Sequence, residues 1–215
     1  MAHRAKPESP NTASGDLYLV SAPSGAGKTS LVAALQSSES GLQVSVSHTT
    51  RPRRDTEVDG VNYHFVSEKE FVAMIDADAF LEHARVFDRR YGTARESVES
   101  YLAVGDDVIL EIDWQGASQV REHHPGCIGI FILPPSRESL IERLHGRAQD
   151  SEEVIARRMR DAIAEMSHYR EFDYLLINDN FDVALSDLRG IVRSRRLRRE
   201  RQSALNRDLI ASLLV

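Results

Sequence analysis

The chain has 215 residues, of which 41% are hydrophobic and 28% charged, so it can bury a sizeable core and suits one compact domain. The formal net charge of −6 disfavours attraction of nucleic acid over the whole surface, and no apolar run approaches the length that spans a membrane. With Cys127 alone no internal disulfide can form, and a cytoplasmic location is the default expectation.

The first residues carry Arg4 and Lys6 but no apolar run behind them. This pattern is typical of a disordered tail rather than of a signal peptide. We therefore expect a tail over residues 1–14 and a folded domain over 15–215.

A β-prone run, DLYLVS at 16–21, leads into the loop SAPSGAGKTS, and apolar residues at helical spacing follow Lys28. Strand, glycine-bearing loop and helix form the setting that a phosphate-binding loop requires. The motif is met except at Ala22, where its first glycine should stand. Alanine is a mild departure because it is disfavoured only where φ must be positive, which the end of a strand does not require.

This loop offers inward backbone N–H groups, a cation at Lys28 and a hydroxyl at Thr29 for a magnesium ion. The alternative is a glycine-containing turn that binds no ligand, but the match in the right context favours a nucleotide site. The residues expected to bind ATP are Ala22, Pro23, Ser24, Gly25, Ala26, Gly27, Lys28 and Thr29.

The next segments are more polar. Polar and apolar residues alternate in QVSVS at 43–47, which predicts a strand, and an arginine-rich loop with Pro52 and Gly60 follows it. Ser67 and Glu70 have capping-box spacing, so a helix is expected to begin there.

Two further strands are expected at 62–66 and 80–87, and a helix at 94–105. The polar block over 47–105 interrupts the strand and helix rhythm of the rest of the chain. We therefore expect an inserted subdomain over these residues.

After this block, DDVILEID at 106–113 and GCIGIFIL at 126–133 are rich in Val, Ile and Leu, as strands buried on both faces are. Alternation of such strands with helices predicts an α/β fold with a mainly parallel, doubly wound sheet. The remaining expected elements are helices at 114–124, 136–147 with Ser136 as N-cap, 151–169 and 182–202, and a strand at 173–178.

From about Asp16 onwards the chain resembles the guanylate kinase family. The segments that carry the resemblance are SAPSGAGKTSL, SVSHTTRPRRDTEVDGVNYHF, FLEHARVFDRRYGTA, ILEIDWQG and RLHGRAQDSEEVIARRM. The resemblance implies a P-loop nucleoside monophosphate kinase fold that transfers a phosphoryl group from ATP to GMP, giving ADP and GDP, with Mg²⁺ as cofactor. The implied parts are a core (15–46, 106–142 and 170–215), a GMP-binding insertion (47–105) and a helical lid (143–169).

The resemblance also implies which side chains surround GMP. Paired guanidinium groups at Arg51 and Arg54 suit a phosphate dianion, although a solvated arginine loop is the alternative. Glu82 would accept both adjacent donors of guanine, which adenine lacks, and would be an ordinary exposed carboxylate without its neighbours. The implied GMP-binding residues are Ser47, Arg51, Arg54, Tyr63, Glu82, Tyr91, Thr93, Glu111 and Asp113.

On the family pattern, Thr93 and Glu111 complete the reading of the guanine edge, although Glu111 stands where many members carry Asp. Asp113 is expected to hold magnesium through water together with Thr29, and it could also touch the acceptor phosphate. From spacing alone, Asp113 could equally be the N-cap of the helix that follows it.

Arg143 and Arg147 lie one helical turn apart, and Arg158 follows on the next predicted helix. The alternative for these arginines is a surface helix pair with Glu–Arg salt bridges, but the resemblance favours a lid that closes over ATP. The attacking phosphate oxygen is already ionised, so no general base is needed. The residues expected to act in catalysis are Lys28, Arg51, Arg143, Arg147 and Arg158. His48, His83, His123 and His124 are interpreted as structural or exposed.

Two other functions compete with this interpretation. A kinase for another monophosphate is disfavoured by Glu82 and Glu111, and a non-catalytic domain that binds phosphopeptides is disfavoured by the intact Lys28 and Thr29. The arginines between 193 and 201 lack interleaved aromatic residues, so we expect a solvated or subunit-contacting face rather than a nucleic-acid site. We expect neither a nucleic-acid nor a membrane partner, and a homo-oligomer is left open.

Overall fold

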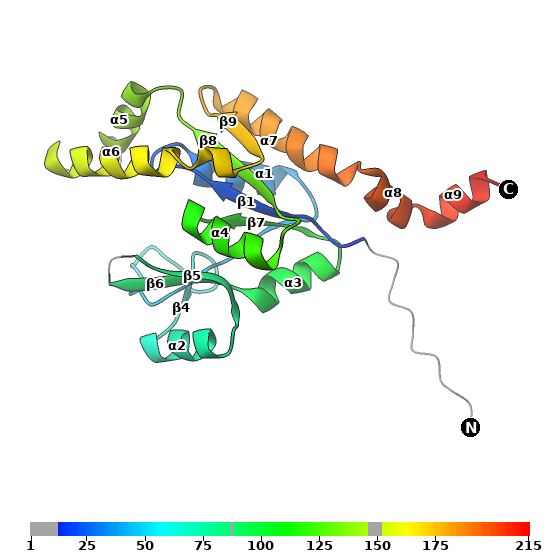
Figure 1. Ribbon diagram of the computed structural model, residues 1–215, viewed down its shortest axis with the longest axis horizontal. Helices are drawn as coiled ribbons and strands as arrows, with labels where there is room; N and C mark the ends of the chain where they lie inside the picture. The colour runs from blue at the N-terminus through cyan, green and yellow to red at the C-terminus, as the bar shows by residue number, and fades with distance from the viewer. Residues whose placement is uncertain (1–12, 87, 146–151) are drawn as a thin grey trace.

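The computed structural model describes residues 13–86, 88–145 and 152–215. Its centre is a five-stranded sheet in the order β2-β7-β1-β8-β9, and every neighbouring pair in it runs parallel (Figure 1). The α/β fold with a parallel core, as the sequence predicts, is confirmed. The strands are β1 (Leu17–Ser21), β2 (Leu42–Val44), β7 (Asp107–Glu111), β8 (Ile128–Leu133) and β9 (Tyr174–Ile177).

Helices cover both faces of this sheet, because successive side chains of a strand point to opposite faces. Tyr18 and Val20 of β1 join one buried cluster with helices α1 (Lys28–Ser38) and α7 (Phe181–Arg196). Leu17 and Leu19 of the same strand join the other cluster, with α3 and α4. The bounds of these two helices are Arg95–Ala103 for α3 and Trp114–His123 for α4.

A second, four-stranded sheet has the order β4-β3-β6-β5 and lies below the core in Figure 1. Strand β5 (Phe80–Val86) pairs antiparallel with β6 (Arg89–Ala94), which the sequence analysis missed because RRYGTA is polar and contains a glycine. The pairing with β5 outweighs this weak local preference. The other two strands are β3 (His48–Thr49) and β4 (His64–Phe65).

Two predicted strands are shorter in the structure. The strand expected over 43–47 ends at Val44, where its pairing with β7 stops, and the chain then enters the second sheet at His48. The strand expected over 62–66 retains only two residues. The predicted capping box is confirmed in α2 (Glu68–Asp76): Glu70 N–H donates to the Ser67 hydroxyl at 3.2 Å, and Ser67 N–H donates to the Glu70 carboxylate at 2.8 Å.

Helices α5 (Arg137–His145) and α6 (Glu152–Met166) pack through Leu140, Leu144 and Met159. The predicted cap of α5 is present, because Ser139 N–H donates to the Ser136 hydroxyl at 3.1 Å. A short 3₁₀ helix at Tyr169–Glu171 follows α6. The segment that joins α5 to α6 includes Arg147 and lies outside the described residues.

The single helix expected over 182–202 is divided in the structure. Helix α7 ends at Arg196, and α8 (Arg199–Leu205) and α9 (Arg207–Leu213) follow it, extending away from the body of the molecule (Figure 1). Within the described ranges, no helix combines the length and apolar character needed to cross a membrane.

The expectation of a solvated or subunit-contacting face is corrected for only some of the arginines at this end of the chain. Arg193, Arg198 and Arg199 are exposed, whereas Arg195, Arg196 and Arg201 are partly buried in ion pairs. Asp107 is fully buried and accepts hydrogen bonds from Arg196 Nε at 2.7 Å and from an Arg201 nitrogen at 2.6 Å. Arg195 pairs with Asp16 at 2.8 Å. These carboxylates come from the start of β1 and β7, far away in sequence. The arginines therefore fasten α7 and α8 to the amino-terminal edge of the sheet.

Candidate active site

The loop between β1 and α1 has the backbone of a phosphate cradle. Gly25 and Gly27 both have φ of 93°, a region that favours glycine. Asp78 is the only non-glycine residue in the described ranges with positive φ, so Ala22 fits this loop without strain, as the sequence analysis argued. Helix α1 begins after Gly27 and has no side-chain cap. Its first N–H groups are therefore available to an anion.

Lys28 lies at the start of α1, and its Nζ is 3.5 Å from the Ile112 carbonyl oxygen. Burial of the ammonium lowers the pKa of Lys28, and the nearby carboxylates of Glu111, Glu165 and Asp113 oppose this effect. Glu165, on α6, was missed because nothing in its local sequence indicates that α6 ends beside the loop. Burial raises the pKa of Glu165, and Lys28 opposes that shift. Helix α6 thus brings a carboxylate to the phosphate loop.

Glu82 and Thr93 face each other across the antiparallel pair β5 and β6. The Thr93 hydroxyl donates to Glu82 Oε1 at 2.6 Å, and the two residues are 1% and 7% exposed respectively. Burial raises the pKa of Glu82, the hydrogen bond from Thr93 lowers it, and the charge of Asp113 raises it further. A buried acceptor carboxylate beside a hydroxyl is the arrangement that the guanine hypothesis requires.

Glu111 and Asp113, two residues apart in the chain, make different contacts in the structure. Glu111 ends β7 and accepts a hydrogen bond from the Thr29 hydroxyl, next to the phosphate loop, at 2.9 Å. Asp113 caps α4 by accepting from Gly116 N–H at 2.8 Å, as the alternative reading expected.

Asp113 also lies on the side of Glu82. A Cβ added to Gly116 would be 3.1 Å from Glu82 Oε2 and 3.5 Å from Asp113 Oδ1, so both carboxyl groups lie beside this glycine. The two acidic residues diverge because β7 ends between them and the chain turns into α4.

Arg51 is held by Glu57, a residue that the sequence analysis did not single out. Both guanidinium NH groups of Arg51 reach the Glu57 carboxylate, at 3.0 and 2.7 Å, and the guanidinium carbon lies 5.4 Å from the centre of the Tyr63 ring. Hydrogen bonds from Arg51 and from the Arg54 backbone lower the pKa of Glu57 to about 2. The side chain of Tyr91 also contacts Arg51. The guanidinium group of Arg51 is therefore already oriented, whereas Arg54 is exposed.

A cavity of about 640 Å³ joins the phosphate loop to the second sheet. Among the predicted site residues, those that line it are Lys28, Thr29, Ser47, Tyr63 and Glu111. A separate cavity of about 390 Å³ lies against Gly25 and Gly27 and is lined by Arg143 and Asn178. The loop therefore borders two cavities.

Of the three predicted lid arginines, Arg143 lies in the last turn of α5 and donates to the Asn178 carbonyl oxygen at 3.0 Å. Arg158 is half-buried on α6. Arg147 lies outside the described residues, so its role stays a prediction.

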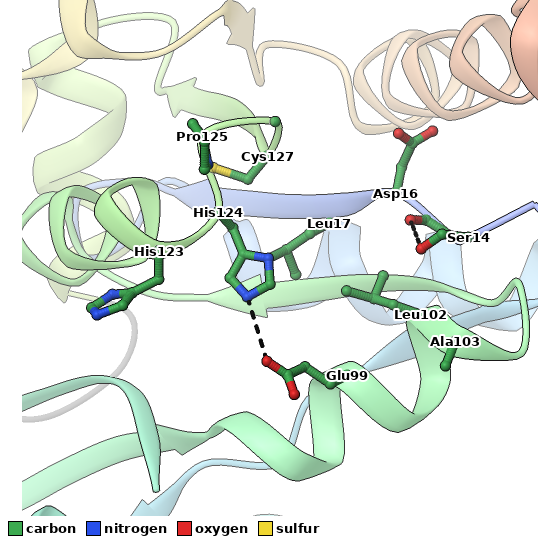
Figure 2. A pocket seen from close by; sticks show the side chains of 12 residues that line it. Ser14, Asp16, Leu17, Glu99, Leu102, Ala103, His123, His124, Pro125 and Cys127 are labelled. Atoms are coloured by element: carbon green, nitrogen blue, oxygen red, sulfur yellow. Dashed lines mark hydrogen bonds and ion pairs between the residues drawn. The ribbon is translucent and has the colours of Figure 1, made fainter. Parts of the chain in front are cut away.

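Figure 2 shows another pocket, of about 510 Å³, at the amino-terminal edge of the sheet. His123 points away from Cys127, and its Nδ1 lies 3.1 Å from the Gln119 carbonyl oxygen. His124 points toward Glu99, 4.0 Å away. Within the part of the chain that the structure describes, no group of three or more His, Cys, Asp or Glu side chains could hold a metal ion.

A phosphate loop at the end of a parallel sheet, facing an inserted sheet with a buried carboxylate, defines a P-loop protein of the nucleoside monophosphate kinase class. A family model described as guanylate kinase matches residues 14–195. The chain belongs to the guanylate kinase family.

Individual relatives agree with this assignment. The guanylate kinase of Nitrosococcus oceani is 60% identical over 201 residues, covering 94% of this chain and 99% of that protein. The guanylate kinase of Salmonella typhimurium is 59% identical over 204 residues, with coverage of 94% and 99%. The crystal structure of guanylate kinase from Anaplasma phagocytophilum has a TM-score of 0.72 and 29% identity, covering 88% of this chain and 90% of that one.

Proposed function

We propose that the protein transfers the terminal phosphoryl group of ATP to GMP, giving ADP and GDP. The observation that carries this proposal is the buried Glu82 carboxylate with its Thr93 partner, located in an inserted sheet that faces the phosphate loop. An ionised carboxylate accepts the two adjacent donors of guanine, and adenine has no such donor pair. The membership of the guanylate kinase family supports the same reaction.

On the donor side, the phosphate loop residues 22–29 bind the phosphates of ATP through backbone N–H groups and Lys28. On the acceptor side, Arg51 and Arg54 bind the GMP phosphate together with Tyr63 and Tyr91. The existing Arg51–Glu57 pair supports this role, because a guanidinium group that is already oriented loses less conformational freedom when it binds phosphate.

For Glu111, which ends β7, and Asp113, which follows it, we propose roles that fit their contacts. Glu111, bonded to Thr29, belongs to the magnesium side, and Asp113, next to Gly116 and Glu82, belongs to the guanine side. This exchanges the roles that the sequence analysis gave them. The Thr29 hydroxyl and the Glu111 carboxylate fit Mg²⁺, which prefers oxygen ligands, and a bound ion would neutralise charge on the phosphates.

The GMP phosphate is itself the nucleophile and is ionised near neutral pH, so the protein aligns the two nucleotides and stabilises charge instead of abstracting a proton. Lys28 and Arg51 supply the cations nearest to the transfer. Arg143, Arg147 and Arg158 belong to a lid over ATP, in the division into core, insertion and lid given above. Closure of this lid would exclude water from the transferring group.

Two broader expectations belong to the same proposal. A cytoplasmic location fits a chain with a single cysteine. A homo-oligomer fits α8 and α9, whose Leu205, Leu209 and Leu213 are each more than half exposed. Light scattering coupled to size-exclusion chromatography measures the assembly state.

A coupled assay with ATP and magnesium tests the function. We expect turnover with GMP and at least about a hundredfold lower kcat/KM with AMP, dTMP and UMP, because a site built to pair buried polar groups rejects partners that leave them unpaired. Equal efficiency with AMP and GMP would exclude the proposed role of Glu82 in selecting guanine, and absence of turnover with GMP would exclude the proposed reaction.

A further inference from the structure

Asn178 follows β9 directly and is 5% exposed. Its backbone N–H donates to the Leu133 carbonyl oxygen at 2.8 Å, which extends the pairing of β9 with β8 by one residue. The residue is therefore fixed by the central sheet. From this position its side chain reaches the phosphate loop.

The Asn178 side-chain amide donates to the Ala26 carbonyl oxygen at 2.7 Å. Both residues are buried, so water does not compete for this hydrogen bond. In a trans peptide the carbonyl oxygen and the next N–H point in opposite directions, and the residues that the structure describes include no cis peptide bond. By holding the Ala26 carbonyl on its own side, Asn178 turns the Gly27 N–H to the opposite side.

Gly27 leaves room for this amide. A Cβ at Gly27 would collide with the Asn178 Nδ2, and the φ of 93° at Gly27 is itself a conformation that side chains disfavour. The glycine of the motif thus serves the packing of Asn178 as well as the turn of the loop.

The backbone oxygen of Asn178 accepts a hydrogen bond from Arg143 at 3.0 Å. Asn178 consequently contacts both the phosphate loop and an arginine of the proposed lid. It also lines the cavity of about 390 Å³ against Gly25 and Gly27, away from the proposed guanine site. Its influence should therefore fall on the donor nucleotide.

We propose that Asn178 is a positioning residue for ATP: its amide holds the Ala26–Gly27 peptide in the orientation that presents the Gly27 N–H to the donor phosphates. This inference rests on the proposed function, which assigns the donor nucleotide to the phosphate loop. It concerns one hydrogen bond at the end of β9. It predicts that substitution of Asn178 weakens the binding of ATP and leaves the binding of GMP nearly unchanged.

The test uses Asn178→Ala and Asn178→Asp in the full chain. Loss of the hydrogen bond should raise the KM for ATP about tenfold, while the KM for GMP stays within about twofold of the parent. Calorimetric titration with ADP and magnesium should show a similar loss of affinity. In Asn178→Asp, the loss relative to the parent should become smaller as the pH falls, because a protonated carboxyl can again donate to the Ala26 carbonyl. Asn178→Ala should lack this recovery.

Asn180→Ala is the matched control. The Asn180 side chain is two residues away and caps α7 by accepting hydrogen bonds from Asp182 and Val183 N–H. Its loss should lower the melting temperature and leave both KM values unchanged.

Three results would overturn the inference: unchanged ADP affinity in both Asn178 variants, equal rises in the two KM values, or the same kinetic change in Asn180→Ala. Failure of the proposed function gives a different result, because the parent protein would then not phosphorylate GMP. The titration with ADP still measures the effect of Asn178 in that case.

Discussion

At the scale of single residues, the chemistry of the site depends on where each carboxyl group lies. Glu82 is buried beside Thr93, Glu111 bonds to Thr29, and Glu57 holds Arg51. Each of these groups has a hydrogen-bond donor already in place. In the proposed function, the contacts of each carboxyl group, more than its residue type, assign it to the base side or to the phosphate side.

The substitution Glu82→Gln tests whether Glu82 recognises the guanine base of GMP. The amide would present a donor to the donors of guanine, so kcat/KM for GMP should fall about a hundredfold or more while the KM for ATP changes little. Steady-state kinetics with GMP and AMP measure this. An unchanged preference for GMP over AMP would show that another group reads the base.

The pH dependence provides a second check on Glu82. Burial raises the pKa of this carboxyl in the folded protein above that of an unfolded glutamate, about 4.3. As the pH falls through the raised pKa, the carboxylate is lost, so the KM for GMP should rise at a higher pH than an ordinary glutamate would give. Folding stability changes in the opposite direction to GMP binding. Because the folded pKa of Glu82 is the higher one, its contribution to stability is full below the unfolded pKa and is lost as the pH rises through the folded pKa. Glu82→Gln should therefore show a flat KM profile and no fall in melting temperature at neutral pH.

Glu111→Gln and Asp113→Asn test the exchanged roles. The Glu111 variant should need about tenfold more magnesium for half-maximal activity, because a ligand charge is lost, with little change in the KM for GMP. The Asp113 variant should instead bind GMP more weakly, with a higher KM for GMP, and leave the magnesium requirement unchanged. A magnesium effect in Asp113→Asn without one in Glu111→Gln would restore the assignment made from the sequence.

At the scale of elements, the candidate site lies at the carboxyl ends of the parallel strands, and a network of ion pairs lies at their amino ends. Asp107 at the start of β7 is fully buried and binds Arg196 of α7 and Arg201 of α8, whereas Glu200 pairs with Arg198 and Arg199 in solvent. Removing one partner of a buried pair leaves an uncompensated charge, but exposed pairs contribute little.

Asp107→Asn should therefore lower the free energy of unfolding by about 2–4 kcal/mol, which is roughly a 5–15 °C fall in melting temperature for a domain of this size. Glu200→Gln, the control, should change stability by less than about 0.5 kcal/mol. Differential scanning calorimetry measures both. Equal and small shifts would mean that the buried network adds nothing to stability. Neutralising Arg198 and Arg199, whose ion pairs are exposed, should leave stability nearly unchanged, whereas neutralising Arg195 and Arg196 should lower it.

At the scale of the whole molecule, the proposed function assigns the two nucleotides to different parts of the fold. The donor is assigned to the loop between β1 and α1 and the acceptor to the inserted sheet, so each should stabilise the folded state separately. A ligand at a hundred times its dissociation constant adds about 2.7 kcal/mol, which corresponds to roughly 5–10 °C here.

Thermal shift measurements with single ligands should show this division. Lys28→Met should lose most of the shift caused by ADP with magnesium and nearly all turnover, because a phosphate-loop lysine binds the β-phosphate of the donor as well as the transferred group. It should keep the shift caused by GMP, which the inserted sheet is proposed to bind. Glu82→Gln should show the reverse pattern. Loss of both shifts in either variant would indicate a general effect on folding instead of two separate sites.

Several features follow from the sequence alone because they depend on neighbouring residues. The phosphate loop at 22–29 is one continuous motif, the capping box at Ser67 spans one helical turn, and the apolar runs of β7 and β8 are local patterns. Residues that act through neighbours in the chain can be found by spacing. Glu82 needed the family resemblance as well, because an isolated carboxylate on a strand has no distinctive pattern.

Other features depend on contacts between residues far apart in the chain, and only the tertiary structure decided them. The amide of Asn178 meets Ala26 across 152 positions, and Arg196 meets Asp107 across 89. Strand β6 exists because β5 pairs with it, and Glu111 and Asp113 separate because β7 ends between them. A buried partner changes the free energy of a side chain by more than local propensity does, and a sequence pattern does not reveal which distant residue that partner will be.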